Sequence, residues 1–498
     1  MKYLNGYGRW LGGIVLTTLL AVWACTSEIV PATGRKQFLG FSWEQEREIG
    51  KQAAQEIGAA FGVYKDAKLQ AYVERVGQRV LKESHLRGAQ ADEEIAKTPI
   101  TFQILDSPTV NAMAIPGGHI YVTRGLLAHL TSEDQLAFVL GHEIGHVSAR
   151  HAARRTWQQQ LGQGLLMGGA ILGQVMGLPA EQILQLGGTA AQLIFLRHSR
   201  GDELESDSLA VNYTKRAGYD PLAVRGFFRS LSQIQEKEGA ALPNFLSTHP
   251  DPGNRVERIT ELTGGTSAKS ASEAIQPEYL AAIDGIVLGE DPRQGFVENG
   301  QFYHPELRFR FPVPRGFKVI NQAAQVAMIE GQQRAVVGFT AVRERSAEAA
   351  ANAFFKQSGL RVRETFKSRS GSLPGVGAIA DAQSQDGQVV RLIAYFAEHR
   401  NQVYHFIAYS APQTFGQYQN EFLRVMSGFG ELTDPEILRR QPVRLDVARA
   451  PRSAPFRNLI PTKLPGELRA EDIAIMNQVA LNQQIEQGRP IKLPRMTG

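Results

Sequence analysis

The sequence predicts an α+β protein: a mainly helical part with a small edge sheet, then a smaller α+β domain, then a short tail module. Up to residue 262 apolar side chains recur mostly at helical spacing, whereas after Phe302 they alternate with polar ones at the period of a strand. With 498 residues the chain exceeds the roughly 250 to 300 residues at which single cores stop growing. We therefore expect five segments: 1–24 (leader), 25–265 (first domain), 266–300 (linker), 301–432 (α+β domain) and 433–498 (tail).

The N-terminus has the composition of a lipoprotein leader. Lys2 and Arg9 precede an uncharged apolar run, Leu11 to Ala24. The junction Val22-Trp23-Ala24-Cys25 resembles a bacterial lipobox, in which the leader is cleaved before a cysteine that is then lipidated. The alternatives are an ordinary secretory signal and an N-terminal anchor. Cys25 is the only cysteine, so the chain can form no internal disulfide and offers no thiolate to a metal.

The leader also predicts a location. We expect a lipid anchor on Cys25 that holds the protein at the periplasmic face of the outer membrane, because Thr26 is not the aspartate that commonly marks inner-membrane lipoproteins. A soluble periplasmic protein is the alternative.

The overall charge argues against a nucleic-acid partner. The 54 basic residues exceed the 49 acidic ones by too little to form an electrostatic footprint for nucleic acid. We interpret the local cluster of Arg150, Arg154 and Arg155 as the solvated end of a helix, where cations suit the negative end of the helix dipole.

Helices and a strand pair are predicted in the first domain. Residues 42–86 show apolar spacing typical of helices, and Pro99 to Leu105 alternates like a strand. Val110 to Val122 predicts two short strands around Pro116-Gly117-Gly118. A strand pair here suggests a sheet edge that could bind an extended peptide through backbone hydrogen bonds. A purely structural hairpin is the alternative.

The segment Thr131 to His151 carries the sequence His142-Glu143-Ile144-Gly145-His146. Thr131 with Asp134 predicts a capping-box start to one continuous helix. Residues four apart share one helix face, so two imidazoles can bind a single Zn²⁺ while Glu143 serves as general base toward the attacking water. This is the zincin arrangement, and one Zn²⁺ per chain is expected. A surface helix with solvated histidines is the alternative.

A third metal ligand must come from elsewhere in the chain. On one helix His151 would lie roughly 180° around from His142, so it could not face the same metal. Glu203 and Asp207 are spaced i, i+4, so one helix can direct one carboxylate at zinc and the other at the free ring nitrogen of a ligand.

These motifs carry a family resemblance. His142 to His146 followed by Ser199-Arg200-x-x-Glu203-x-x-x-Asp207 resembles the zinc metalloprotease family that holds HtpX, the CaaX prenyl endopeptidases and BepA. The resemblance implies ligands His142, His146 and Glu203, and Glu143 as base. Asp207 matches a family aspartate described either as a group that contacts a metal-binding residue or as a proton donor. Ser206 departs from the alanine usual there.

Two further segments of the first domain allow alternatives. Gly162 to Phe195 is apolar and glycine-rich, but Gln174, Pro179 and Glu181 favour two short helices, packed near the site or against lipid, over a transmembrane hairpin. His249 lies in a loop with two prolines. It is either a solvated loop residue or a residue that reaches the zinc pocket. In the pocket it could act as a lid that takes the open coordination position, or it could stabilise the oxyanion. We favour the lid.

After Phe302 the sequence predicts a domain without a second catalytic group. Strands are expected at 307–311, 335–342, 389–396 and 403–409, with a turn at Asp386-Gly387, and helices at 347–356 and 415–426. His304, His399 and His405 have no partners at ligand spacing, which favours a binding or scaffolding role. Residues 464–494 resemble a small envelope-binding module of LysM type.

Two function classes follow. The first is a zinc-dependent endopeptidase of the bacterial envelope that hydrolyses misfolded or misassembled proteins. The second is an envelope assembly factor or chaperone-like binder with a latent protease domain. Expected partners are extended peptide or protein substrates, a membrane through the lipid on Cys25, and envelope assembly machinery, but no nucleic acid.

Overall fold

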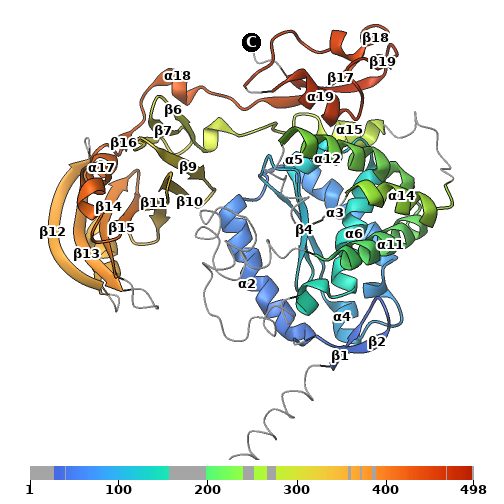
Figure 1. Ribbon diagram of the computed structural model, residues 1–498, viewed down its shortest axis with the longest axis horizontal. Coiled ribbons are helices and arrows are strands. Elements are labelled where there is room, and N and C mark those ends of the chain that lie inside the picture. The colour runs from blue at the N-terminus through green and yellow to red at the C-terminus, as the bar shows by residue number, and fades with distance from the viewer. Residues whose placement is uncertain are drawn as a thin grey trace, which may run out of the picture.

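The structure is a computed structural model that describes residues 27–39, 41–155, 198–238, 249, 252–265, 276–356, 360–370, 373–383, 389–466 and 468–495. Over these residues the chain is mixed α/β with several separate sheets (Figure 1). The predicted leader with Cys25, the apolar stretch Gly162–Phe195 and the Asp386-Gly387 turn lie outside the described residues. Within the described part, no helix combines the length and apolar character needed to span a bilayer.

A three-stranded sheet lies inside the first part of the chain. Its order is β3 (Thr101–Leu105), β5 (His119–Thr123), β4 (Ala112–Ile115), with β3 parallel and β4 antiparallel to β5. The predicted strand pair is confirmed, because a turn in which Gly117 and Gly118 both have positive φ joins β4 to β5. β4 is therefore an edge strand.

Helices cover both faces of this sheet (Figure 1). Helix α2 (Trp43–Phe61) packs on one face, where Ile57 joins a core with Met113 and Tyr121. Helices α3 (Ala67–Lys82) and α6 (Glu133–Ser148) belong to the larger core on the opposite face. The shorter elements of this part are β1 (Ser27–Val30), β2 (Arg35–Phe38), α4 (Glu93–Lys97) and α5 (Arg124–His129).

Helix α6 is the most deeply buried helix of this part, and its start differs from the prediction. The N-cap is Ser132, whose hydroxyl accepts a hydrogen bond from the backbone N–H of Gln135. The predicted Thr131–Asp134 capping box is wrong, because the Thr131 N–H donates to the Gln135 side chain instead, at 2.8 Å. Every residue from Asp134 to Ser148 is buried. This helix therefore carries its polar side chains into the protein interior.

Helix α11 (Arg200–Arg216) lies close against α6. A Cβ placed on Gly145 of α6 would lie 3.2 Å from the Cα of Ser206, so the backbones approach at van der Waals distance. Small residues at both positions permit this approach, and a buried serine fulfils the requirement as alanine would. Helices α12 (Val224–Glu238) and α14 (Pro252–Leu262) complete the bundle around α6 and α11.

The predicted linker 266–300 is not an extended connection over its described residues. It contains α15 (Pro277–Ile283), whose buried Tyr279 donates a hydrogen bond to the Leu127 carbonyl at 2.7 Å. It also contains strand β6 (Phe296–Glu298) of the next sheet. The prediction was wrong because the Gly- and Ser-rich stretch that suggested a linker ends before an amphipathic helix that enters the first core.

The middle of the chain forms two antiparallel sheets. A four-stranded sheet has the order β16-β8-β7-β6, and a seven-stranded sheet has the order β12-β13-β14-β15-β11-β10-β9. Helices α16 (Ala347–Phe355) and α17 (Phe415–Ser427) pack in separate cores against the larger sheet. The strands are β7 (Gln301–His304), β8 (Phe309–Pro312), β9 (Phe317–Asn321), β10 (Gln325–Glu330), β11 (Ala335–Val342), β12 (Leu360–Ser370), β13 (Leu373–Gln383), β14 (Val389–His399), β15 (Gln402–Ser410) and β16 (Gly430–Glu431).

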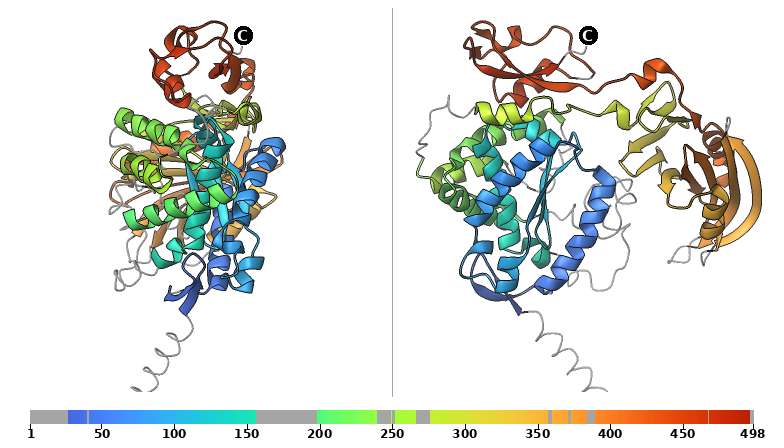
Figure 2. Two further views of the ribbon diagram at one scale, coloured as in Figure 1. Left: turned by 90° about the vertical axis from the view of Figure 1, so that its right-hand side faces the viewer. Right: turned by 180° about the vertical axis from the view of Figure 1, so that it is seen from behind.

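The C-terminal segment returns to the first part of the chain (Figures 1 and 2). After α18 (Pro435–Leu438), strands β17 (Arg444–Arg449) and β20 (Pro490–Arg495) pair, as do β18 (Ala454–Pro455) and β19 (Gln484–Ile485), with α19 (Ala470–Met476) between them. Leu445, Phe456 and Ile473 lie in the same apolar core as α3 and α6. The tail predicted as a module of its own therefore shares a core with the first domain.

One buried lysine holds the C-terminal segment against the first part of the chain. Lys492 is 1% exposed, and its Nζ atom donates to the carbonyls of Ala128 and Leu130 at 2.6 and 2.8 Å, just before α6. Gln478 adds a second contact, because its amide exchanges hydrogen bonds with the Gln135 side chain of α6. The C-terminal segment thereby satisfies backbone and side-chain groups at the start of the central helix.

We expect Lys492→Met to destabilise the protein by about 1–3 kcal/mol, because two buried carbonyls lose their donor. Urea unfolding measures the change. The matched control is Arg495→Met on the same strand, whose ion pair is 43% exposed and should contribute less than about 1 kcal/mol. A Lys492→Met protein as stable as wild type would contradict the assigned contact.

Candidate functional site

Helices α6 and α11 bring five of the six predicted site residues together. His142, Glu143 and His146 project from α6, and Glu203 and Asp207 from α11. All five are at most 3% exposed. Burial of so many ionisable groups is costly unless they pair with one another or with a metal. The sixth residue, His249, is also buried and lies against them.

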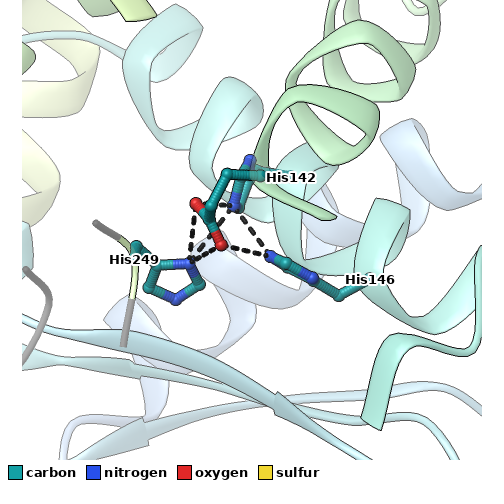
Figure 3. A group of neighbouring side chains, drawn as sticks. His142, His146 and His249 are labelled. Atoms are coloured by element: carbon teal, nitrogen blue, oxygen red, sulfur yellow. Dashed lines mark hydrogen bonds and ion pairs between the residues drawn. The ribbon is translucent and has the colours of Figure 1, made fainter. Parts of the chain in front are cut away.

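Four side chains direct one ligand atom each toward a common point (Figure 3). The Nε2 atoms of His142 and His146 are 2.9 Å apart, and each lies 3.4 Å from a Glu203 oxygen. The Nδ1 atom of His249 lies 3.3 Å from His142 Nε2 and 3.0 Å from Glu203 Oε1. With metal–nitrogen distances of about 2.0–2.1 Å, tetrahedral zinc separates its ligand atoms by roughly 3.3 Å. The residues present therefore fit one zinc ion.

The charges of the cluster favour a cation at this point. Burial and the Arg255 guanidinium lower the pKa of His142, but Glu203 and Asp207 outweigh them and raise it to about 9. Burial lowers the pKa of His146 well below its usual range. Burial would raise the pKa of Glu203, but His249 and His142 hold it well below normal. The carboxylate thus stays ionised, and a positive charge between the rings is stabilised.

Glu143 lies beside this cluster with a free carboxylate oxygen. Its Oε1 atom is buried and has no hydrogen-bond partner among the described residues, and it lies 3.6 Å from His249 Nε2. Burial raises the pKa of Glu143. A desolvated carboxylate next to a metal-binding group has the properties of a general base.

Asp207 supports the outer side of His142. Its Oδ1 atom accepts from His142 Nδ1 at 2.9 Å. Arg255 of α14 binds both carboxylate oxygens of Asp207, at 2.6 and 2.8 Å, and its Nη1 lies 3.4 Å from Glu203. These contacts outweigh burial and lower the pKa of Asp207. The carboxylate is held ionised, facing the Nδ1 atom of His142.

Comparisons with known proteins give a family match that covers these helices. The sequence pattern of peptidase family M48 matches residues 67–263. This stretch includes α6, α11 and α14, and so every residue of the cluster. Residues 67–263 form an M48 metallopeptidase domain.

Similar proteins include the beta-barrel assembly-enhancing protease of Yersinia pestis, with 29% identity over 49% of this chain and 51% of that protein. The Escherichia coli K12 protein of the same name is 25% identical over 58% of this chain and 57% of that protein. The mitochondrial metalloendopeptidase OMA1 of Schizosaccharomyces pombe is 26% identical over 51% of this chain and 71% of that protein. The chain thus matches about half the length of the two bacterial relatives.

The end of α6 in the M48 domain differs from the prediction for His151. The helix stops at Ser148, and Arg150 has a left-handed φ of 53°, so His151 does not continue the helix. His151 lies outside the four-ligand group, but the helical-wheel reason given for this was wrong. Its Nδ1 atom lies 2.8 Å from His146 Nδ1, on the side of that ring facing away from the other ligands.

The basic cluster at this end is only partly solvated, because the side chains of Arg154 and Arg155 are 28% and 26% exposed. Arg150 is 1% exposed and forms an ion pair with Glu46, while Arg154 and Arg155 donate to Asp202 at 2.6 and 2.7 Å. The prediction of a solvated helix end was wrong for Arg150, which is buried. Arg154 and Arg155 keep part of their surface exposed but, like Arg150, neutralise a carboxylate that the fold buries. They brace α11 against the segment that follows α6.

Sequence reasoning missed two residues of the M48 site, Arg255 and His151. Arg255 lies four residues before the fully buried Ile259, so it is a cation on the apolar face of α14. That position was the available signal, since a buried arginine needs an anionic partner. His151 offered no such signal, because its placement depends on a backbone conformation that the sequence does not specify.

We expect Arg255→Met to destabilise the metal-free domain by about 3–5 kcal/mol, because it leaves the Asp207 carboxylate buried and uncompensated. Adding Asp207→Asn should recover part of the loss, since the unpaired charge is then removed. Denaturant unfolding of both variants measures this coupling. Arg258→Met on the same helix is the control, because Arg258 is 44% exposed. Strictly additive effects would refute the pairing.

Proposed function

We propose that this protein is a zinc-dependent endopeptidase of the bacterial cell envelope that hydrolyses misfolded or misassembled envelope proteins. The observation that carries the proposal is the buried convergence of His142, His146 and Glu203, with the unpartnered Glu143 oxygen beside them. The envelope assignment rests on the leader and on relatives named as beta-barrel assembly-enhancing proteases. Both the substrate class and the location belong to the proposal.

Each residue of the site is assigned a separate role in peptide hydrolysis. His142, His146 and Glu203 would hold the zinc ion, which would serve as a Lewis acid toward the scissile carbonyl and the attacking water. Glu143 takes the proton from the attacking water and delivers it to the leaving amine. Asp207 orients His142. We assign Asp207 no proton-donor role, because Arg255 and His142 engage both of its oxygens.

Substrate binding is assigned to strand β4. It packs beside α6, and among the described strands it pairs only with β5. An extended peptide added to its other edge would gain backbone hydrogen bonds independent of sequence. This mode suits clients recognised by exposed, unfolded backbone. The sheets between residues 296 and 431 are assigned a binding or scaffolding role.

His249 is assigned the role of a lid. Its Nδ1 atom lies within 3.0–3.3 Å of Glu203 and His142, at the position of a fourth ligand. A neutral imidazole there would exclude water and substrate from the open coordination position. The resting enzyme would then be closed, and substrate entry would require displacement of His249.

The decisive experiment uses Glu143→Gln. We expect hydrolysis of a casein-type substrate to fall by about 10²- to 10⁴-fold while one zinc per chain is retained, since the base is lost and the ligands remain. The exposed Glu261→Gln serves as control. In cells, Glu143→Gln should reproduce the envelope protein turnover defect of a deletion. A deletion defect that Glu143→Gln does not share would favour the assembly factor with a latent peptidase.

The lid role of His249 gives a separate prediction. His249→Ala should raise basal proteolysis, including self-cleavage, because the fourth position is opened, while zinc content stays unchanged. Rates measured without and with an unfolded protein substrate separate basal from stimulated activity. If kcat instead falls by about 10²-fold or more, His249 stabilises the oxyanion. Wild-type rates under both conditions would exclude both roles.

The cellular location is proposed from the sequence alone. Cys25 is expected to carry diacylglycerol and to anchor the protein to the outer membrane on its periplasmic side. Mass spectrometry of the mature N-terminus and membrane fractionation test this. An unmodified N-terminus, or recovery with the soluble periplasm, would refute it.

A further inference from the structure

We propose that His151 is a positioning residue for the metal ligand His146, acting through a hydrogen-bonded chain that continues to Glu205. The inference rests on the proposed metal site and deepens it. His146 Nδ1 and His151 Nδ1 are 2.8 Å apart, and His151 Nε2 lies 3.1 Å from Glu205 Oε2. Both histidines are buried, whereas the Glu205 side chain is 35% exposed.

The chain admits one arrangement of protons when Nε2 of His146 faces the cation. A neutral imidazole carries one N–H, so His146 must then carry it on Nδ1 and donate it to His151 Nδ1. His151 accepts there and carries its own proton on Nε2, which donates to the Glu205 carboxylate. The anion at the end of the chain thus fixes the tautomers of both rings.

Neighbouring groups are consistent with this assignment. The Ser206 hydroxyl lies 3.4 Å from His151 Nδ1, and Asp202 lies 3.7 Å from His151 Nε2. His198 stacks on the His146 ring at 3.9 Å between centroids and 28° between planes, so it packs on the face of the ring and does not bond at its edge. Among the described residues, His151 is the hydrogen-bond partner of His146 Nδ1.

The two ligand histidines are therefore supported differently. His142 donates directly to the carboxylate of Asp207, which Arg255 fixes from the far side. His146 reaches a carboxylate only through a second imidazole. Partners of this kind orient the ring and raise ligand basicity, and their loss typically weakens metal affinity by about 10- to 100-fold.

The backbone holds His151 in place by an unfavourable turn. Arg150 has φ 53°, a left-handed conformation that costs a side-chain-bearing residue about 1–3 kcal/mol. Its guanidinium is fixed by Glu46, to which Nε donates at 2.8 Å, and by the Phe41 carbonyl at 3.1 Å. Without this turn the chain would continue the helix and carry His151 away from His146.

The test compares His151→Leu with His151→Gln in the full-length protein. Leucine fills the site without an acceptor, whereas glutamine offers an oxygen to His146 and an N–H to Glu205. Zinc affinity is measured by chelator competition, and the ligand field by the visible spectrum of the cobalt-substituted protein. We expect His151→Leu to lose about 10- to 100-fold in zinc affinity with an altered cobalt spectrum, and His151→Gln to restore most of both.

A variant at the surface tests the same chain without the risk that a change at buried His151 causes misfolding. Glu205→Ala removes the terminal carboxylate from the exposed side of α11 and should weaken zinc binding in the same direction, whereas Glu261→Ala, a 71% exposed glutamate of α14, should not. Wild-type affinity and cobalt spectra in both His151→Leu and Glu205→Ala would overturn the role of His151. A wild-type protein that binds no zinc would overturn the proposed metal site itself.

Discussion

The geometry of the site depends on the close approach of α6 and α11. Gly145 presents no side chain toward α11, so the helix backbones meet at Ser206, one residue before Asp207 and three after Glu203. Only at this separation can a glutamate on one helix reach two imidazoles on the other at 3.4 Å. A larger residue at either position would separate the helices and move Glu203 away from His142 and His146.

This approach buries charge, and the surrounding structure is organised to compensate for it. Arg255 neutralises Asp207 and Glu203 on one side, while Arg154 and Arg155 neutralise Asp202 on the other. Desolvated carboxylates without such partners would take up protons, and the site would then lose the negative charges of Glu203 and Asp207 that face His142. The arginines therefore keep the site in the ionisation state that a divalent cation requires.

The sequence was sufficient for features that depend on local periodicity. The i, i+4 pairs on α6 and α11 place their side chains correctly because helix geometry alone decides which residues share a face. It was not sufficient for contacts between distant segments. Arg255 lies 48 residues from Asp207, and Lys492 lies 364 residues from Ala128. His151 was misplaced because one strained residue, Arg150, overrides helix periodicity.

The family match and the folded unit do not coincide. The M48 match ends at residue 263, but the core around α6 extends to α15 and to the C-terminal strands. Tyr279, Gln478 and Lys492 satisfy groups at α5, at the start of α6 and between them. A fragment limited to residues 67–263 would expose apolar surface and leave these groups unpaired. The helix that carries His142, Glu143 and His146 is therefore supported by α15 and by the C-terminal segment, and the sheets between residues 296 and 431 are inserted within one folded unit.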